Sequence, residues 1–107
     1  HWLKPYAAFC YLRDKWKTAD CSQWKSHNVF DAAAVEKLAL PNTKSGREIG
    51  FWYFVQYHLH QQLADAVAYA HKQGIALKGD IPIGIYRHGA DAWMAPELYN
   101  MNQQAGA

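Results

Sequence analysis

The spacing of apolar residues predicts three helices in the first two thirds of the chain. Apolar side chains recur every three or four positions over residues 2–16, which is the spacing of one helix face, and Pro5 suits the first turn. A shorter helix is expected to begin after Asp31 as N-cap. It must end before Pro41, because the residue preceding a proline disfavours helical geometry.

The longest predicted helix runs from about residue 46 to 73. It opens on a sequence that fits a capping box, Ser45 to Glu48, and Gly74 fits the glycine that stops a helix. Its length would be about 42 Å, more than the diameter of roughly 34 Å expected for a compact chain of this size. The segment 51–55, FWYFV, is aromatic on all sides, which is typical of burial on several sides. We therefore expect the helix to project, and the chain to be a piece of a larger fold.

The period changes after Gly74, where residues 75–80 fit a short strand of the mostly buried type that helices cover in parallel sheets. Continuation of that strand is weakened by Pro82, which cannot donate to a ladder, and by Gly84. Short helical turns, interrupted by a proline, are predicted over 91–99. The order of helix, strand, loop and helix is typical of a β/α unit.

These elements predict two regions and an α/β fold class. Residues 1–74 would form a helical segment that surrounds a barrel. Residues 75–107 would form a strand-loop-helix unit of that barrel, with a loop-like tail from Asn100. The expected architecture is part of a (β/α)8 TIM barrel, predominantly helical, with one or two short strands.

The carboxyl end of the predicted strand is the best place for chemistry, because barrel strands carry their functional residues there. Asp80 lies at that end and shares a strand face with Lys78; a buried ion pair or a turn-capping carboxylate is an equally good explanation. The following loop offers hydrogen-bonding groups and a stacking face in Tyr86, Arg87 and His88. Arg87 could also be an ordinary solvated charge.

Two residues of the last predicted helical turns allow two interpretations each. Asp91 is either an N-cap or a hydrogen-bond acceptor for a ligand. Trp93 is either a core anchor or a platform for a sugar ring.

Composition narrows the possible partners. The 11 Lys and Arg residues against 9 Asp and Glu residues give a net charge of +2, too weak to indicate nucleic acid. The apolar runs are far shorter than the roughly 20 residues that span a bilayer. Cys10 and Cys21 lack a metal-binding spacing and are expected to be reduced thiols of a cytoplasmic protein. No cofactor is expected, and His58 and His60 point apart on their helix, so they cannot share a metal.

Several segments resemble one family of enzymes. Residues 78–87 (KGDIPIGIYR), 90–93 (ADAW) and 96–99 (PELY) are similar to the 4-α-glucanotransferases, also called amylomaltases or disproportionating enzymes. Residues 2–9 (WLKPYAAF) and 51–57 (FWYFVQY) resemble the same family. The GIYR variant is closest to the plant-type cytosolic branch and its bacterial relatives.

The resemblance implies a (β/α)8 barrel enzyme that transfers α-1,4-glucan segments between maltooligosaccharides with retention of configuration, without a cofactor. Asp80 matches the family's aspartate at the end of an early barrel strand, where it supports the active site. Asp80, Tyr86, Arg87, Asp91 and Trp93 are then the expected substrate-binding residues. The family's nucleophile lies in an Arg-x-Asp motif that this chain lacks, as it lacks the acid/base glutamate, so the chain by itself is expected to be inactive.

One departure from the family pattern concerns the loop. Many members carry His-Asp-Ser before the Ala-Asp-x-Trp segment, where this chain has Arg87, His88 and Gly89. Contacts of the family's loop are therefore not transferred to His88 or Gly89.

The alternative from another class is a free-standing helical module, either for protein interaction or for carbohydrate binding without catalysis. The long amphipathic helix and the 15% aromatic content favour it. A module would be monodisperse, whereas a piece of a barrel would self-associate through exposed edges.

Overall fold

The computed structural model describes residues 1–103, and within this range the chain is helical and contains no strand. The predominantly helical character expected from the sequence is confirmed. No helix in the described part of the chain is both long and apolar enough to cross a membrane. Four α-helices and two 3₁₀-helices follow one another along the chain: α1 (Leu3–Trp16), η1 (Cys21–Gln23), α2 (Ala32–Leu38), α3 (Lys44–Lys72), α4 (Ala90–Met94) and η2 (Pro96–Leu98).

Three of the predicted helix ends are confirmed by the structure. Asp31 caps α2 as predicted: its Oδ1 accepts hydrogen bonds from the amides of Ala33 at 2.9 Å and Ala34 at 3.3 Å. Gly74 adopts φ = 76°, the left-handed conformation that stops a helix. The split of the last helical region is also confirmed, since α4 ends before Pro96 and η2 begins on it.

The predicted capping box of α3 is wrong. The N-cap is Thr43, whose Oγ1 accepts a hydrogen bond from the amide of Gly46 at 2.9 Å. Ser45 lies inside the first turn, and its hydroxyl donates to the carbonyl of Leu38 at 2.7 Å. Thr43 therefore supplies the same kind of capping bond two residues earlier, and Ser45 ties α3 to the end of α2.

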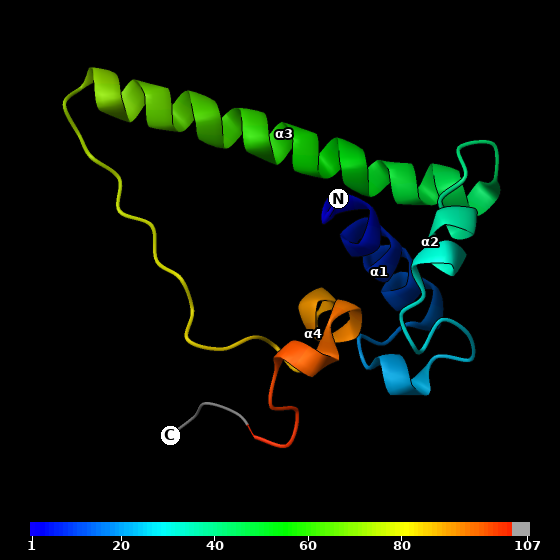
Figure 1. Ribbon diagram of the computed structural model, residues 1–107. Coiled ribbons are helices and arrows are strands. Elements are labelled where there is room, and N and C mark those ends of the chain that lie inside the picture. Colours follow the sequence, from blue (N-terminus) through cyan, green and yellow to red (C-terminus); the bar gives the residue numbers. More distant parts are fainter. Residues whose placement is uncertain (104–107) are drawn as a thin grey trace.

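Helix α1 is the centre of the fold. It packs against α2, α3 and α4. In Figure 1, α1, α2 and α4 all lie on the same side of α3. Ala7 and Ala8 are fully buried, and their small side chains allow neighbouring elements to approach the α1 backbone closely. Leu12 from α1 and Ile49 from α3 are also completely buried and belong to the same core cluster.

Four aromatic rings close the core on the side of α4. The ring of Trp93 lies 5.9 Å from Phe9, 5.8 Å from Trp24 and 5.1 Å from Phe30. The Trp93 indole N–H donates to the carbonyl of His27 at 2.9 Å, so this buried side chain has no unpaired polar group. These contacts attach α4 to α1 and to the loop after η1.

Helix α3 projects beyond the core as expected. Only its first part reaches α1, and Gly46 and Ile49 are its buried residues (Figure 1). The radius of gyration is 16.7 Å, against about 13 Å for a compact chain of this length. The accessible surface is 8258 Å², against about 6,100 Å² for a compact monomer of this mass.

The predicted burial of segment 51–55 on several sides is wrong for the described chain. Phe51 is 56% exposed and Phe54 is 61% exposed, and further along α3 Leu63 is 64% exposed. The helix carries apolar residues on more faces than α1 can cover. Those faces are left without a partner within residues 1–103.

The predicted strand over residues 75–80 is also wrong in this structure. The segment leaves α3 as an extended chain and runs to α4 without pairing with any other part of the described chain (Figure 1). A strand needs a neighbour to satisfy its backbone donors and acceptors, and no second strand is present here to provide one. The predicted tail lies outside the described residues from position 104 onward.

Two glycines of α3 allow a test of how tightly its start is packed. A Cβ added at Gly46 would lie 1.8 Å from the carbonyl oxygen of Leu40, whereas a Cβ at Gly50 would meet nothing within 4 Å. We expect Gly46→Ala to lower the free energy of unfolding by about 1–3 kcal/mol through overpacking. Gly50→Ala should raise it by about 0.5–1 kcal/mol, because alanine loses less entropy in a helix. Urea unfolding measures both, and equal effects would contradict the packing described.

Candidate functional site

The segment between α3 and α4 holds most of the predicted site residues and is largely exposed. Ile81 is 90% exposed and Ile83 is completely exposed. Asp80 and Lys78 lie in this segment and form no ion pair or side-chain hydrogen bond within residues 1–103. The expected shared strand face of these two residues is absent, because the segment is not part of a sheet.

Tyr86 and Arg87 are brought together at an open hollow of about 650 Å³. One wall is the segment from Gly84 to His88, and the other is formed by Tyr99, Asn100, Met101 and Gln103. Tyr86 is 69% exposed, so its ring is available for stacking. The hollow thus combines an aromatic face, a guanidinium and amide groups, which suits a ligand rich in hydroxyl groups.

The other predicted residues lie outside the lining of this hollow. Asp91 is exposed in the first turn of α4, and Gly89 rather than Asp91 is the N-cap of that helix. Trp93 is 3% exposed and packed among aromatic rings, which is the position of a core anchor. Asp80 lies earlier in the extended segment.

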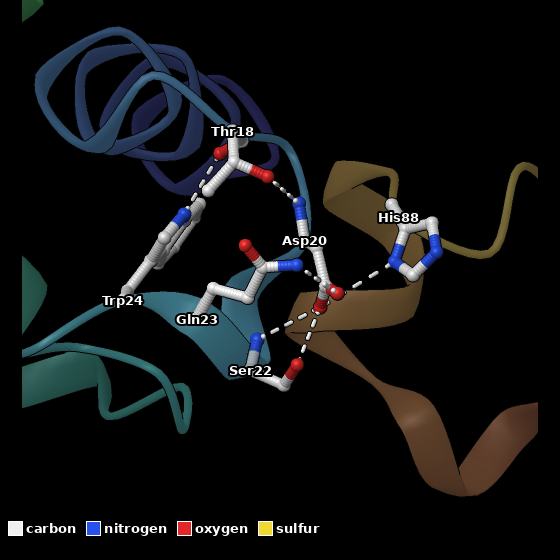
Figure 2. A network of polar contacts seen from close by, with 6 residues as sticks. All are labelled: Thr18, Asp20, Ser22, Gln23, Trp24 and His88. Carbon is white, nitrogen blue, oxygen red and sulfur yellow. Dashed lines mark hydrogen bonds and ion pairs between the residues drawn. The ribbon is translucent and has the colours of Figure 1, made fainter.

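A polar network around Asp20 adjoins the hollow and was not found by sequence reasoning (Figure 2). Its Oδ1 accepts hydrogen bonds from the Ser22 hydroxyl at 2.6 Å and the Ser22 amide at 3.1 Å, and Oδ2 accepts from the Gln23 side chain at 2.9 Å. His88 Nδ1 lies 3.6 Å from Oδ1. Asp20 is thus the link between the loop before η1 and the loop before α4.

The surroundings of Asp20 favour its ionised form. Hydrogen bonds from Ser22 and Gln23, and to a smaller extent the positive charge available on His88, hold the pKa of Asp20 below its ordinary value. Because the pKa is lowered in the folded state, the stabilisation is complete above the ordinary carboxyl pKa of about 3.9 and is lost as the pH falls further.

One local signal could have pointed to Asp20. An aspartate two residues before a serine is typical of a side chain that caps a short turn, and Asp20 does cap η1. No sequence signal links Asp20 to His88, because the two residues are far apart along the chain and only the packing of α4 on α1 brings them together.

Metal ligation has no support in this part of the chain. Among residues 1–103 no group of three or more histidine, cysteine, aspartate or glutamate side chains is placed to hold a metal ion.

Comparison with known proteins gives one consistent family. The chain is 48% identical over 106 residues to the 4-alpha-glucanotransferase DPE2 of Oryza sativa subsp. japonica. The aligned region is 99% of this chain and 11% of the rice protein. It is 28% identical to the 4-alpha-glucanotransferases of Clostridium butyricum and Thermus thermophilus, covering 96% of this chain in each case. The matched region is 21% of the Clostridium protein and 20% of the Thermus protein. No solved structure gives a significant match.

The chain thus spans between about a tenth and a fifth of the length of these curated relatives. The family model of the 4-alpha-glucanotransferases matches residues 1–107, which is the whole chain. The resemblance seen in the sequence motifs is confirmed, and the chain belongs to the 4-alpha-glucanotransferase family.

Proposed function

We propose that these residues are part of an enzyme that transfers α-1,4-glucan segments between maltooligosaccharides with retention of configuration. The observation that carries this proposal is the family match over the whole chain, together with 48% identity to a plant 4-alpha-glucanotransferase. The proposed reaction needs no cofactor. We place the enzyme in the cytoplasm, in keeping with the likeness to the plant-type cytosolic branch and with free thiols at Cys10 and Cys21.

In the whole enzyme, residues 75–107 would form a strand-loop-helix unit of a (β/α)8 barrel, and residues 1–74 the helices around it. The exposed apolar side chains of the extended segment support this assignment, among them Ile75, Leu77, Ile81 and Ile83. Such a run is typical of a parallel strand covered by helices on its faces. The apolar faces of α3 would then be covered by the same barrel.

Within that barrel, Asp80 would stand at the end of the strand and support the active site. Tyr86 and Arg87 would contact the glucan at the hollow, and Asp91 would accept a hydrogen bond from a sugar hydroxyl. Trp93 would support the substrate site indirectly, since its buried ring fixes the position of α4. Stacking on the exposed Tyr86 ring suits a pyranose, whose C–H face is apolar and whose edge carries hydroxyl groups.

Retention of configuration requires two displacements. A carboxylate attacks the anomeric carbon and the glycosidic oxygen leaves with a proton from an acid. A hydroxyl of a second glucan then displaces the carboxylate and gives its proton to the conjugate base of that acid. The resemblance implies that the nucleophile and the acid/base lie outside these 107 residues. The chain would therefore contribute substrate contacts and support, but not the reacting carboxylates.

The first test is the activity of the chain itself. We expect the 107-residue protein, incubated with maltotriose, to produce neither longer maltooligosaccharides nor glucose, because both displacements need carboxylates that it lacks. High-performance anion-exchange chromatography of the products measures this. An enzyme of the same family assayed in parallel is the positive control, and any growth in the length of the oligosaccharides would contradict the assignment.

The second candidate function is a free-standing helical module for protein interaction or carbohydrate binding. It is favoured by the shared core of α1 and α4, which gives the chain a folded body of its own. The two candidates differ in what the uncovered part of α3 does in solution.

We expect the chain to self-associate, because the apolar faces of α3 have no partner within residues 1–103. Phe54→Gln should shift the association to higher protein concentration, since Phe54 is 61% exposed and its ring makes no core contact. Arg47→Gln, also on the exposed surface of α3, is the matched control and should change little. Sedimentation velocity over a range of concentrations measures the effect, and a monomer at every concentration would favour the free-standing module.

A further inference from the structure

We propose that Asp20 is a positioning residue for the loop of residues 84–88 that lines the hollow. Through His88 it holds Tyr86 and Arg87 at the hollow, and it does so most strongly at mildly acidic pH. This inference rests on the proposed function, in which Tyr86 and Arg87 contact the glucan. It assigns a role to a carboxylate that the family motifs in this chain do not include.

Asp20 is held firmly enough to act as a fixed point. Its carboxylate accepts three hydrogen bonds from Ser22 and Gln23, and its own amide donates to Thr18 Oγ1 at 3.1 Å (Figure 2). The Thr18 carbonyl accepts the indole N–H of Trp24 at 2.8 Å, and Trp24 is a core residue with 3% exposure. The loop that carries Asp20 is thereby tied to the aromatic core.

His88 moves together with Tyr86 because a tight turn joins them. The amide of Gly89 donates to the Tyr86 carbonyl at 3.0 Å, and the rings of Tyr86 and His88 lie 5.7 Å apart. A Cβ at Gly89 would come within 3.0 Å of the same Tyr86 carbonyl, so the turn is close-packed. A force that fixes His88 therefore fixes Tyr86 and Arg87 as well.

The ion pair between Asp20 and His88 restrains the loop of residues 84–88, which is otherwise attached to the folded core only at its C-terminal end within residues 1–103. Trp93 anchors α4, which follows the loop, whereas the segment before the loop is exposed and unpaired within residues 1–103. In the described part of the chain, Asp20 is the only carboxylate that forms an ion pair with His88. The other ionisable groups around the hollow are Tyr86, Arg87 and Tyr99, and Asp91 follows in the first turn of α4.

The direction of the pH dependence follows from the two charges. Asp20 has a lowered pKa and is ionised at neutral and mildly acidic pH. The histidine carries the opposite charge only when its ring is protonated, and the gap of 3.6 Å is too long for a neutral hydrogen bond. The attraction is therefore present only in the protonated form of His88, which a lower pH favours.

The test measures hydrogen exchange of the Gly89 amide by NMR in the 107-residue protein, at about pH 5.5 and pH 8. Asp20→Asn keeps the shape of the side chain and removes its charge. We expect exchange of Gly89, corrected for intrinsic rates, to be about two- to five-fold faster in this variant at the lower pH and unchanged at the higher pH, as suits a partly exposed ion pair. Asp14→Asn is the matched control, because among residues 1–103 Asp14 forms an ion pair only with the neighbouring Arg13.

His88→Gln provides a second, independent variant, since it leaves every hydrogen bond of Asp20 to Ser22 and Gln23 in place. It should speed exchange of Gly89 by the same factor, and the double variant should add nothing. If at the lower pH the Gly89 amide exchanged at the same rate in His88→Gln as in the unaltered protein, the inference would be overturned. This holds even if Asp20→Asn disturbed the fold.

A parallel titration with maltotriose, followed by tryptophan fluorescence, separates this inference from the proposed function. Weaker binding in Asp20→Asn by about two- to five-fold, confined to the lower pH, supports both. An unchanged affinity with faster Gly89 exchange overturns the link from the loop to substrate positioning. Failure of every form to bind maltotriose, with faster exchange in both variants, counts against the glucan contacts of Tyr86 and Arg87 and leaves the restraint of the loop established.

Discussion

The insertion of Trp93 between α1 and the loop after η1 is the contact on which the position of α4 and of the loop before it depends. Its ring lies within 6 Å of Phe9, Trp24 and Phe30, and its indole N–H is paired with the His27 carbonyl. Each aromatic pair contributes about 0.5–1.5 kcal/mol beyond the burial of its surface. Without this contact α4 would lose its aromatic anchor on the helical body, and the partly exposed ion pair between His88 and Asp20 would remain.

A second constraint is that α3 and the segment after it offer more apolar surface than residues 1–103 can cover. The two parts respond differently because a helix satisfies its backbone within itself, whereas a strand needs a neighbour. Helix α3 therefore keeps its form while Phe54 and Leu63 remain exposed, and residues 75–80 remain extended and unpaired. Membership of a family whose relatives are five to nine times longer gives a physical reason for this unused surface.

Local signals in the sequence predicted local structure well. The Asp31 cap, the Gly74 stop and the break at Pro96 depend on neighbouring residues only, and all three are present. The start of α3 was misplaced because Thr43 and Ser45 are both good capping residues, and the choice between them depends on contact with α2. The site shows the same division: Tyr86 and Arg87 adjoin in sequence and share the hollow, whereas the pairing of Asp20 with His88 arises from tertiary packing.

The most direct measurement of the central claim is hydrogen exchange across the chain in Trp93→Phe. The substitution removes the bond to the His27 carbonyl and part of the ring contact. We expect two amides of the α4 hydrogen-bond ladder, those of position 93 and of the C-cap Ala95, to lose protection corresponding to about 1–3 kcal/mol. The amides of α1 and α3 should keep theirs, because their contact does not involve α4. Unchanged protection in α4, or an equal loss in all three helices, would contradict the role of Trp93 as the anchor of α4.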